Sequence, residues 1–537
     1  MDVDRYQPTH PVRFVTATSL FDGHDAAINI MRRILQQTGA EVIHLGHNRS
    51  VQEIVDTAIE EDAQGIAVSS YQGGHMEYFK YMHDLLEERG AEHVRVYGGG
   101  GGVIVAEEKE ELEDYGIAHI YSPDEGMDMG LQGMINDMVE ACDFPVVDAE
   151  FHVPDDVPMR DPRTVARNLT RVEAPEPERA AVVVGAEQEA ESQSVDGDPR
   201  GDGSPEKMDV ETLNVERSNV PTLGITGTGG AGKSTLTDEL VRRFLNDHED
   251  LELAVLSVDP TRRRTGGALL GDRIRMNAIY GTNADRVYMR SFATRAANRT
   301  TTEALKEAIG VCQAADFDLI LVETSGIGQS DTEIVDLTDL TLYVMTHDFG
   351  APTQLEKIGM LDLADFVAIN KFEKRGSEDA LRDVRKQVQR NRMRFDEDPE
   401  EMPVYPTMAS RFGDPGVTRL YLGLLDRLNA NFDFERESGT YDADEVPEPD
   451  PSEVAIIPPD RQRYLGEIAE TCDAYHDWVE RQVEYARKWG EAKGARQQVE
   501  DWAPEDQDQI AGRLDEMEAH WWDKLDKRCK EILENWD

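Results

Sequence analysis

The chain has 537 residues, of which 108 are acidic and 56 are lysine or arginine, so its formal net charge is −52. This length exceeds what one hydrophobic core organises and predicts two or three domains. The negative charge repels phosphate backbones and anionic lipids, so we expect neither a nucleic acid nor a membrane partner. The acidic residues are spread along the whole chain, which favours a halophilic protein with a solvated surface.

The cysteines and the apolar segments indicate the compartment in which we expect the protein. The four cysteines are far apart and show neither metal-ligand spacing nor a disulfide framework; they are Cys142, Cys312, Cys472 and Cys529. No segment at the start has a signal-peptide pattern, and no window approaches the ~20 apolar residues that cross a bilayer. We therefore expect a cytoplasmic protein.

The hydrophobic pattern divides the chain into α/β and acidic segments. Residues 10–147 alternate apolar runs with amphipathic stretches, which predicts a doubly wound, flavodoxin-like parallel sheet. Residues 148–218 are rich in Asp, Glu, Pro, Ser and Gly and are predicted to be a disordered linker. A second α/β domain is expected over 219–435, with strands at 222–226, 251–259, 317–325, 340–346 and 366–370.

A second acidic linker is predicted over 436–457, followed by a helical segment over 458–537. The segment contains an apolar stripe at helical spacing, made of Ile468, Cys472, Tyr475, Val479, Ala486 and Trp489. It also contains all six tryptophans, which are Trp478, Trp489, Trp502, Trp521, Trp522 and Trp536. Two interpretations stay open, because aromatic residues are enriched in cores and in interfaces: a helical hairpin that packs on the second domain, or a docking surface for another subunit.

A candidate metal-binding histidine follows the first predicted strand. Asp22-Gly23-His24 would lie in a βα loop at the carboxyl edge of the sheet, where open α/β sheets bind ligands. An imidazole there can coordinate cobalt through one nitrogen while the Asp22 carboxylate accepts the proton of the other. Ser69 and the glycine run 98–102 follow later strands of the same sheet.

These three elements resemble the cobalamin-binding signature. The resemblance implies that His24 ligates cobalt in place of the displaced tail base, that Asp22 orients His24, and that Ser69 binds the tail. The glycines implied to lie along the tail are Gly99, Gly101 and Gly102. Ala27 and Tyr71 depart from the general pattern, yet DGHDAAINIMRRI and SSYQGGH read closely like the fused isobutyryl-CoA mutases. His75 follows Gly73-Gly74 and could line the tail pocket.

A P-loop follows the strand at 222–226 and opens a helix. In this context backbone N–H groups wrap the nucleotide phosphates, Lys233 neutralises their charge, and Ser234 reaches Mg²⁺. Lys233 is therefore also a catalytic candidate. The predicted nucleotide-binding residues of this loop are Gly227, Gly229, Gly230, Ala231, Gly232, Lys233, Ser234 and Thr235.

Carboxylates that could serve a magnesium site lie at strand ends and in a loop; they are Asp259, Asp272 and Glu323. The passages VDPTRRRTGGALLGDRIRM and VETSGIGQSD resemble the switch regions of the GTPase chaperones of cobalamin-dependent mutases. The resemblance implies that Ser234 and these carboxylates hold or reach Mg²⁺ and that Arg275, Thr324 and Gly326 contact the nucleotide. Gln329 is a candidate for positioning the attacking water.

The segment Asn370-Lys371-Phe372-Glu373 resembles the Asn-Lys-x-Asp guanine motif, in which the carboxylate accepts hydrogen bonds from guanine. Glu373 replaces the usual Asp, so GTP stays favoured while ATP is less firmly excluded.

In the fused isobutyryl-CoA mutases, a cobalamin domain, a GTPase and a helical linker precede a substrate-binding barrel, and no barrel pattern occurs before Asp537. The resemblance implies adenosylcobalamin, GTP and Mg²⁺ as cofactors and a carbon-skeleton mutase as the activity. We expect a separate acyl-CoA mutase barrel subunit, an oligomer, and an adenosyltransferase as a further partner. Two alternatives are a stand-alone GTPase metallochaperone for cobalamin and a corrinoid carrier for methyl transfer.

Overall fold

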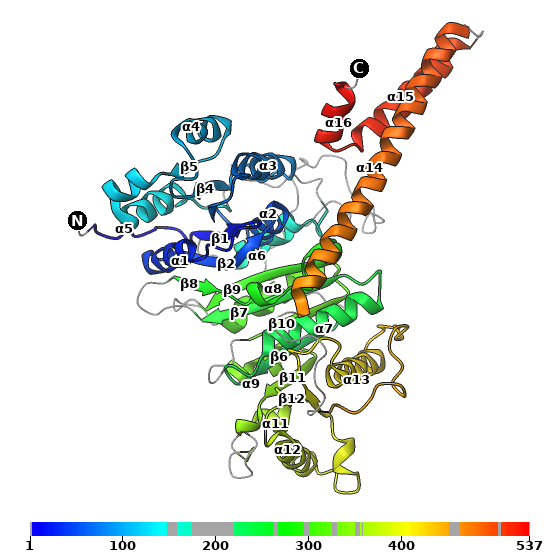
Figure 1. The fold of residues 1–537 in the computed structure, drawn as a ribbon. Coiled ribbons are helices and arrows are strands. Elements are labelled where there is room, and N and C mark those ends of the chain that lie inside the picture. The colour runs from blue at the N-terminus through cyan, green and yellow to red at the C-terminus, as the bar shows by residue number, and fades with distance from the viewer. Residues whose placement is uncertain are drawn as a thin grey trace, which may run out of the picture. The chain divides into compact units, whose positions relative to one another are not determined.

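The computed structural model describes residues 3–147, 158–173, 220–260, 267–294, 301–324, 330–349, 355–356, 358–450, 462–502 and 506–535. The chain divides into two compact units, Met1–Val454 and Ala455–Asp537, and each is described by itself. The first unit contains two parallel sheets with helices on their faces (Figure 1). The predicted α/β class is therefore confirmed.

The first sheet has six parallel strands in the order β5-β4-β3-β1-β2-β8. Its strands are β1 (Arg13–Ser19), β2 (Glu41–Arg49), β3 (Gly65–Ser69), β4 (Arg95–Gly99), β5 (His119–Tyr121) and β8 (Ala268–Leu270). Strand β8 belongs to the second predicted domain, but it pairs with β2 of the first (Figure 1). A strand of three residues is too short to give a periodic signal, and the sequence did not predict β8 or β5.

Helices cover both faces of this sheet, which places its apolar core in two layers. The helices are α1 (Ala26–Thr38), α2 (Val51–Glu60), α3 (His75–Glu88), α4 (Ala106–Tyr115) and α5 (Pro123–Ala141). Apolar residues of α1 and α5 pack on one face, and those of α2, α3 and α4 pack on the other. Helix α2 begins at a capping box in which Ser50 and Glu53 each accept a hydrogen bond from the other's backbone N–H.

Part of the predicted disordered linker is a buried helix, so the prediction was wrong for that part. Helix α6 (Pro162–Glu173) buries Val165, Leu169 and Val172, which are three or four residues apart and lie on one face. They join the core of the second domain. The average composition of 148–218 concealed this short stripe. The rest of that prediction, apart from residues 158–161, lies outside the described residues.

The second sheet has seven parallel strands in the order β13-β12-β11-β6-β10-β7-β9. Its strands are β6 (Thr222–Gly227), β7 (Leu253–Pro260), β9 (Val287–Thr294), β10 (Leu319–Glu323), β11 (Leu340–Met345), β12 (Phe366–Asn370) and β13 (Val404–Thr407). The helices are α7 (Lys233–Asp247), α8 (Thr301–Ala314), α9 (Ser330–Leu337), α11 (Met360–Leu363), α12 (Ser377–Asn391) and α13 (Pro415–Asn431). The described part of this domain also has the short 3-10 helices η4 (Arg273–Arg275), η5 (Gly281–Arg286), η6 (His347–Phe349) and η7 (Pro399–Glu401). The five predicted strands are confirmed, and β9 and β13 complete the sheet.

The second unit is helical, as predicted, with α14 (Gln462–Trp502), α15 (Gln507–Asp523) and α16 (Lys527–Glu534). Aromatic rings join α14 to α15: Trp489 lies 4.9 Å from Trp522, and Tyr485 lies 5.9 Å from Trp521, between ring centroids. These tryptophans therefore pack within the unit. The described helices contain no stretch that is long and apolar enough to cross a membrane.

Candidate functional site

The loop between β1 and α1 holds His24 in a fixed orientation. The His24 Nδ1 lies 2.8 Å from Asp22 Oδ1, and the His24 backbone N–H donates to the same oxygen over 2.9 Å. The other oxygen of Asp22 accepts from the backbone N–H of Tyr71. The side chain of Asp22 is buried, while that of His24 is 77% exposed. This geometry engages Nδ1 and leaves Nε2 as the nitrogen available to a ligand outside the fold.

The ionisation of Asp22 supports the same orientation. Burial alone would raise the pKa of this carboxyl, but hydrogen bonds from Tyr71 and His24 lower it below its usual value. An ionised Asp22 accepts the Nδ1 proton of His24 and increases the ligand strength of Nε2. The residues therefore fit a cobalt ligand supported by a carboxylate.

Strand register brings Ser69 and the glycine run to the same edge. Ser69 ends β3, and it pairs with Thr18 on β1 and with Gly99 on β4. The Ser69 hydroxyl is buried and has no hydrogen-bond partner among the described residues. A Cβ at Gly102 would meet nothing within 4 Å, and one at Gly99 would meet only the Tyr121 carbonyl at 3.6 Å. An unsatisfied hydroxyl beside open backbone fits a bound polar tail.

Gly101 adopts a φ of +57°, which favours glycine, and it turns the chain beside Tyr71. His75 begins α3, the helix that follows β3. Both nitrogens of its buried ring have partners, since Nε2 lies 3.0 Å from Glu108 and Nδ1 lies 3.2 Å from the Gln72 carbonyl. His75 thus connects α3 to α4 through Glu108, and its place in a tail pocket stays a prediction.

The P-loop lies between β6 and α7, as predicted. A Cβ at Gly227, whose φ is +149°, would lie 1.9 Å from the Val344 carbonyl oxygen, so this close approach requires glycine. The buried Lys233 begins α7 and donates to the Gly227 carbonyl over 3.1 Å. The glycines predicted to wrap the phosphates, Gly229, Gly230 and Gly232, lie between these two points, with Ala231 among them and Thr235 in the first turn of α7.

The candidate guanine motif contacts the P-loop directly. Asn370 ends β12 and donates to the Ala231 carbonyl over 2.8 Å, and Lys371 donates to the Gly230 carbonyl over 2.7 Å. Glu373 is exposed in the loop that follows. The fold thus brings together two motifs that are 138 to 141 residues apart in the sequence.

Ser234 lies at the centre of a carboxylate cluster. Its hydroxyl is 2.7 Å from Glu323 and 3.1 Å from Asp272. Glu323 ends β10 and also accepts from Thr237 over 3.0 Å. Arg275 donates to Asp272, and its guanidinium lies 3.4 Å from the Ser234 hydroxyl.

The electrostatics of this cluster favour a cation. Burial and the charge of Asp272 raise the pKa of Asp259 to about 7 and that of Glu323 to about 7. Burial and the mutual repulsion of the carboxylates cause these shifts, and oxygen ligands are those that Mg²⁺ prefers. The residues therefore fit Mg²⁺ beside Ser234.

The switch predictions can be checked only in part. Thr324 follows β10, and its hydroxyl donates to Thr226 over 2.8 Å, close to the P-loop. Gly326 and Gln329 lie outside the described residues.

The segment that carries Asp272 also holds the two domains together. Arg273, whose side chain is 1% exposed, donates to Glu60 at the end of α2, to Glu61 over 3.1 Å, and to the Met289 carbonyl over 2.9 Å. Glu61 also accepts from Ser291 on β9 over 2.9 Å. Asp272 and Arg273 are consecutive, so one residue contacts the P-loop and the next contacts the first domain. The sequence analysis missed Arg273, because nothing in GDRIRM distinguishes a buried arginine.

Helix α6 extends this contact between the domains. Its last residue, Glu173, accepts from Arg13 on β1 over 2.8 Å and from Arg290 on β9 over 2.7 Å. Arg167, in the middle of α6, pairs with Asp62 over 3.0 Å. All five side chains are largely buried. The seam between the domains is therefore defined by buried ion pairs.

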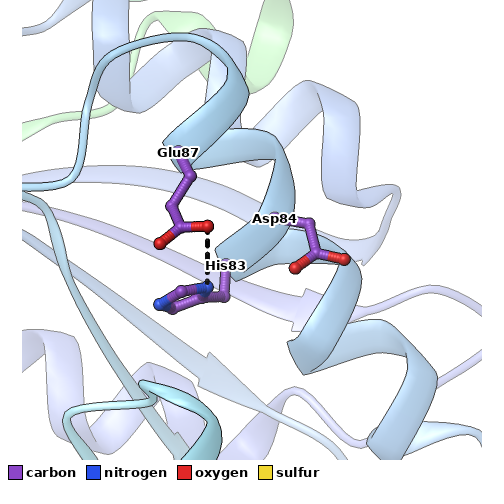
Figure 2. A group of neighbouring side chains, drawn as sticks. All are labelled: His83, Asp84 and Glu87. Atoms are coloured by element: carbon purple, nitrogen blue, oxygen red, sulfur yellow. Dashed lines mark ion pairs between the residues drawn. The ribbon is translucent and has the colours of Figure 1, made fainter. Parts of the chain in front are cut away.

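A further group of possible metal ligands lies on α3 (Figure 2). His83 Nδ1 is 4.0 Å from Glu87, and Asp84 accepts from the Tyr115 hydroxyl over 2.7 Å. Asp84 already has a partner and Glu87 is exposed, as acidic groups without a metal commonly are. We assign no metal to this group.

Two protein-family models match the chain. One is described as "Methylmalonyl Co-A mutase-associated GTPase MeaB" and covers residues 207–443, and the other is "B12 binding domain" and covers residues 12–131. The B12-binding range contains His24 and every strand of the first sheet except β8, and the MeaB range contains β8, the second sheet and the P-loop. The chain therefore has a B12-binding domain and a MeaB-type GTPase domain.

Single relatives match both domains at once. A "Fused isobutyryl-CoA mutase" of Geobacillus kaustophilus is 52% identical over 99% of this chain and 46% of its own length. Another of that name, of Cupriavidus metallidurans, is 53% identical over 92% of this chain and 42% of its own length. "GTPase ArgK" of Escherichia coli is 35% identical over 28% of this chain and 45% of its own length. The chain thus spans less than half the length of these two fused relatives, and it is similar to them over 99% and 92% of its own length.

Proposed function

We propose that this chain is the cobalamin-binding and GTPase subunit of an adenosylcobalamin-dependent acyl-CoA mutase of the isobutyryl-CoA or methylmalonyl-CoA type. The observation that carries the proposal is the joining of two sites in one unit: the Asp22-His24 loop on the first sheet and the Ser234 carboxylate cluster on the second, connected through Arg273. The partner that we propose is an acyl-CoA mutase barrel that binds the substrate.

The first domain would hold and orient the cofactor. His24 would ligate cobalt through Nε2, Asp22 would keep its Nδ1 protonated, and Ser69 would bind the displaced tail. Bound adenosylcobalamin supplies a cobalt–carbon bond whose homolysis starts a carbon-skeleton rearrangement. The protein's part would be to hold the cofactor at the sheet edge, where the substrate subunit could reach it.

The second domain would bind and hydrolyse GTP. Lys233 would contact the terminal phosphates, and Ser234 with Asp272 and Glu323 would hold or orient Mg²⁺. Asn370 supports the P-loop, and Glu373 would select guanine. Gln329 stays our candidate for positioning the attacking water.

GTP would control loading of the cofactor through the seam between the domains. A nucleotide with Mg²⁺ changes what Asp272 contacts, and Arg273 carries that change to Glu60 and Glu61 on the first domain. A nucleotide shifts an equilibrium only when it contacts the two states differently. We propose that the two states differ in what Asp272 contacts, because Arg273 beside it is bound to the first domain.

The first test is a spectroscopic titration with adenosylcobalamin at high salt. The wild type should adopt the base-off, histidine-ligated spectrum, and His24→Ala should not. His476→Ala, which removes an exposed histidine of the other unit, serves as the matched control and should behave as the wild type. If the wild-type spectrum does not change, the first domain is not a cobalamin site.

The second test separates the mutase from the alternative of a stand-alone GTPase metallochaperone. "GTPase ArgK", which matches only part of this chain, keeps that alternative open. Reconstitution with a barrel subunit should give acyl-CoA isomerisation that is lost in His24→Ala. Transfer of cobalamin to another protein, driven by GTP and without isomerisation, would instead establish the chaperone.

A further inference from the structure

Two neighbouring hydroxyl groups at the edge of the first sheet lack hydrogen bonds. Thr18 on β1 pairs in register with Ser69 on β3, so their side chains extend from the same face of the sheet. Both side-chain oxygens are buried, and neither has a partner among the described residues. Buried hydroxyls without a partner are rare, and two side by side indicate a missing ligand.

The other hydroxyls of these strands are satisfied, which makes the pair distinctive. One residue further along, on the opposite face, the Ser19 hydroxyl donates to Ser70 over 2.9 Å. Two residues earlier, on the same face as Thr18, the Thr16 hydroxyl lies 3.0 Å from His44 Nδ1. Among the hydroxyl groups of β1 and β3, only those of Thr18 and Ser69 lack a hydrogen-bond partner.

The position of the pair indicates what could bind there. Its face is the one that α1 and α5 cover, where Phe14 and Ala67 belong to the core. Gly99 pairs with Ser69 on the next strand and adds no side chain. A slender group with polar atoms could therefore pass over Gly99 and reach both hydroxyls. The loop of His24 follows β1 at the same edge.

We propose that Thr18 is a second hydroxyl group that binds the nucleotide tail of cobalamin, beside Ser69. The inference rests on the proposed cobalamin function. Thr18 would donate to, or accept from, a polar atom of the tail and so position it between the sheet and the helices α1 and α5.

The experiment compares two corrinoids that differ in the tail. Adenosylcobalamin has the nucleotide tail and adenosylcobinamide lacks it, and both are titrated into the full chain. Thr18→Val replaces the hydroxyl by a methyl group of similar size, and we expect ~3- to 10-fold weaker binding of adenosylcobalamin, the effect of one hydrogen bond. Binding of adenosylcobinamide should be unchanged. Thr18→Ser should restore the affinity for adenosylcobalamin.

Stability without ligand gives an independent measurement. Thr18→Val should not lower the melting temperature of the free protein, because the hydroxyl has no partner to lose. Ser19→Ala is the matched control: it breaks the bond to Ser70 and should lower the melting temperature while leaving the preference between the two corrinoids unchanged.

Unchanged adenosylcobalamin affinity in Thr18→Val, or an equal loss for both corrinoids, would overturn the role of Thr18 while leaving the cobalamin site intact. Failure of the wild type to bind either corrinoid would instead overturn the proposed function itself, and the two failures are thereby distinguished.

Discussion

Replacing Arg273 by methionine should weaken the contact between the two domains and lower the free energy of unfolding. The substitution keeps a long, flexible side chain and removes a guanidinium that is 1% exposed and that pairs with Glu60 and Glu61. Removing one partner of a buried ion pair generally lowers stability by about 3–5 kcal/mol. Glu61 keeps its bonds from Ser291. Glu60 is therefore the carboxylate that mainly loses its partner, and we expect the free energy of unfolding to decrease by about 3 kcal/mol, the lower end of that range.

The assay is thermal unfolding of wild type and Arg273→Met at fixed salt. About 3 kcal/mol corresponds to a melting temperature lower by roughly 6–12 °C for a domain of this size. The matched control is Arg382→Met, whose pair with Asp379 is exposed on both sides. An exposed pair contributes about 0–1 kcal/mol, so that variant should melt close to the wild type.

Arg273→Met should also weaken communication between the sites. In the wild type we expect a non-hydrolysable GTP analogue to change the affinity for adenosylcobalamin, and the variant should reduce that change while both ligands still bind. Equal melting temperatures of Arg273→Met and Arg382→Met, together with an undiminished effect of the nucleotide, would refute the role assigned to Arg273.

Glu323→Gln should weaken Mg²⁺ in the GTPase by ~10- to 100-fold, because Glu323 orients Ser234, and a Mg²⁺ titration of GTP hydrolysis measures this. Burial lowers the pKa of His44 to about 4, so the unfolded chain binds a proton at higher pH than the folded chain does. The free energy of unfolding should therefore decrease by ~1.4 kcal/mol per pH unit as the pH falls from 6.5 towards 4. Denaturant unfolding of His44→Gln should lack this pH dependence. Glu373→Asp should raise the preference for GTP over ATP roughly ten-fold in competition binding.

The residues that the sequence predicted well lie in short contiguous motifs. Lys233 and Ser234 follow their strand and open their helix as the P-loop pattern requires. His24 and Asp22 lie in one loop, and they are hydrogen-bonded as expected. In each case local spacing alone determines which groups meet. Predicting the position of Ser69 required only one further expectation, which is that neighbouring parallel strands end at the same edge of the sheet.

Long-range contacts were not predictable in the same way. Arg273 and Glu60 are 213 residues apart, and each looks like a surface residue in its own segment. Helix α6 is a different case, since Val165, Leu169 and Val172 do have helical spacing. Their signal was present, but averaging over an acidic segment hid it. A search with windows as short as one helix would have found it.

The orphan hydroxyl of Thr18 could not be predicted either, because it is defined by what the surrounding strands leave unsatisfied. The register between β1 and β3 determines that Thr18 lies beside Ser69, and this register is known only from the folded sheet. The physical signal is a difference between adjacent positions: Ser19 has a partner and Thr18 does not.

The charge of the seam between the domains bears on how the two sites can communicate. The chain has a net charge of −52, yet four arginines of its described residues are buried at this seam. Arg13, Arg167, Arg273 and Arg290 face carboxylates of the first domain or of α6. The energy of an apolar seam would change little with small movements of one domain against the other. The energy of a buried ion pair depends on its geometry, and separating the pair leaves a strongly unfavourable buried charge. The main chain at Asp272 therefore cannot move far without either carrying Glu60 with it or breaking the pair with Arg273. Either outcome would transmit the state of the nucleotide site to the end of α2, and for this reason we propose the seam as the coupling element.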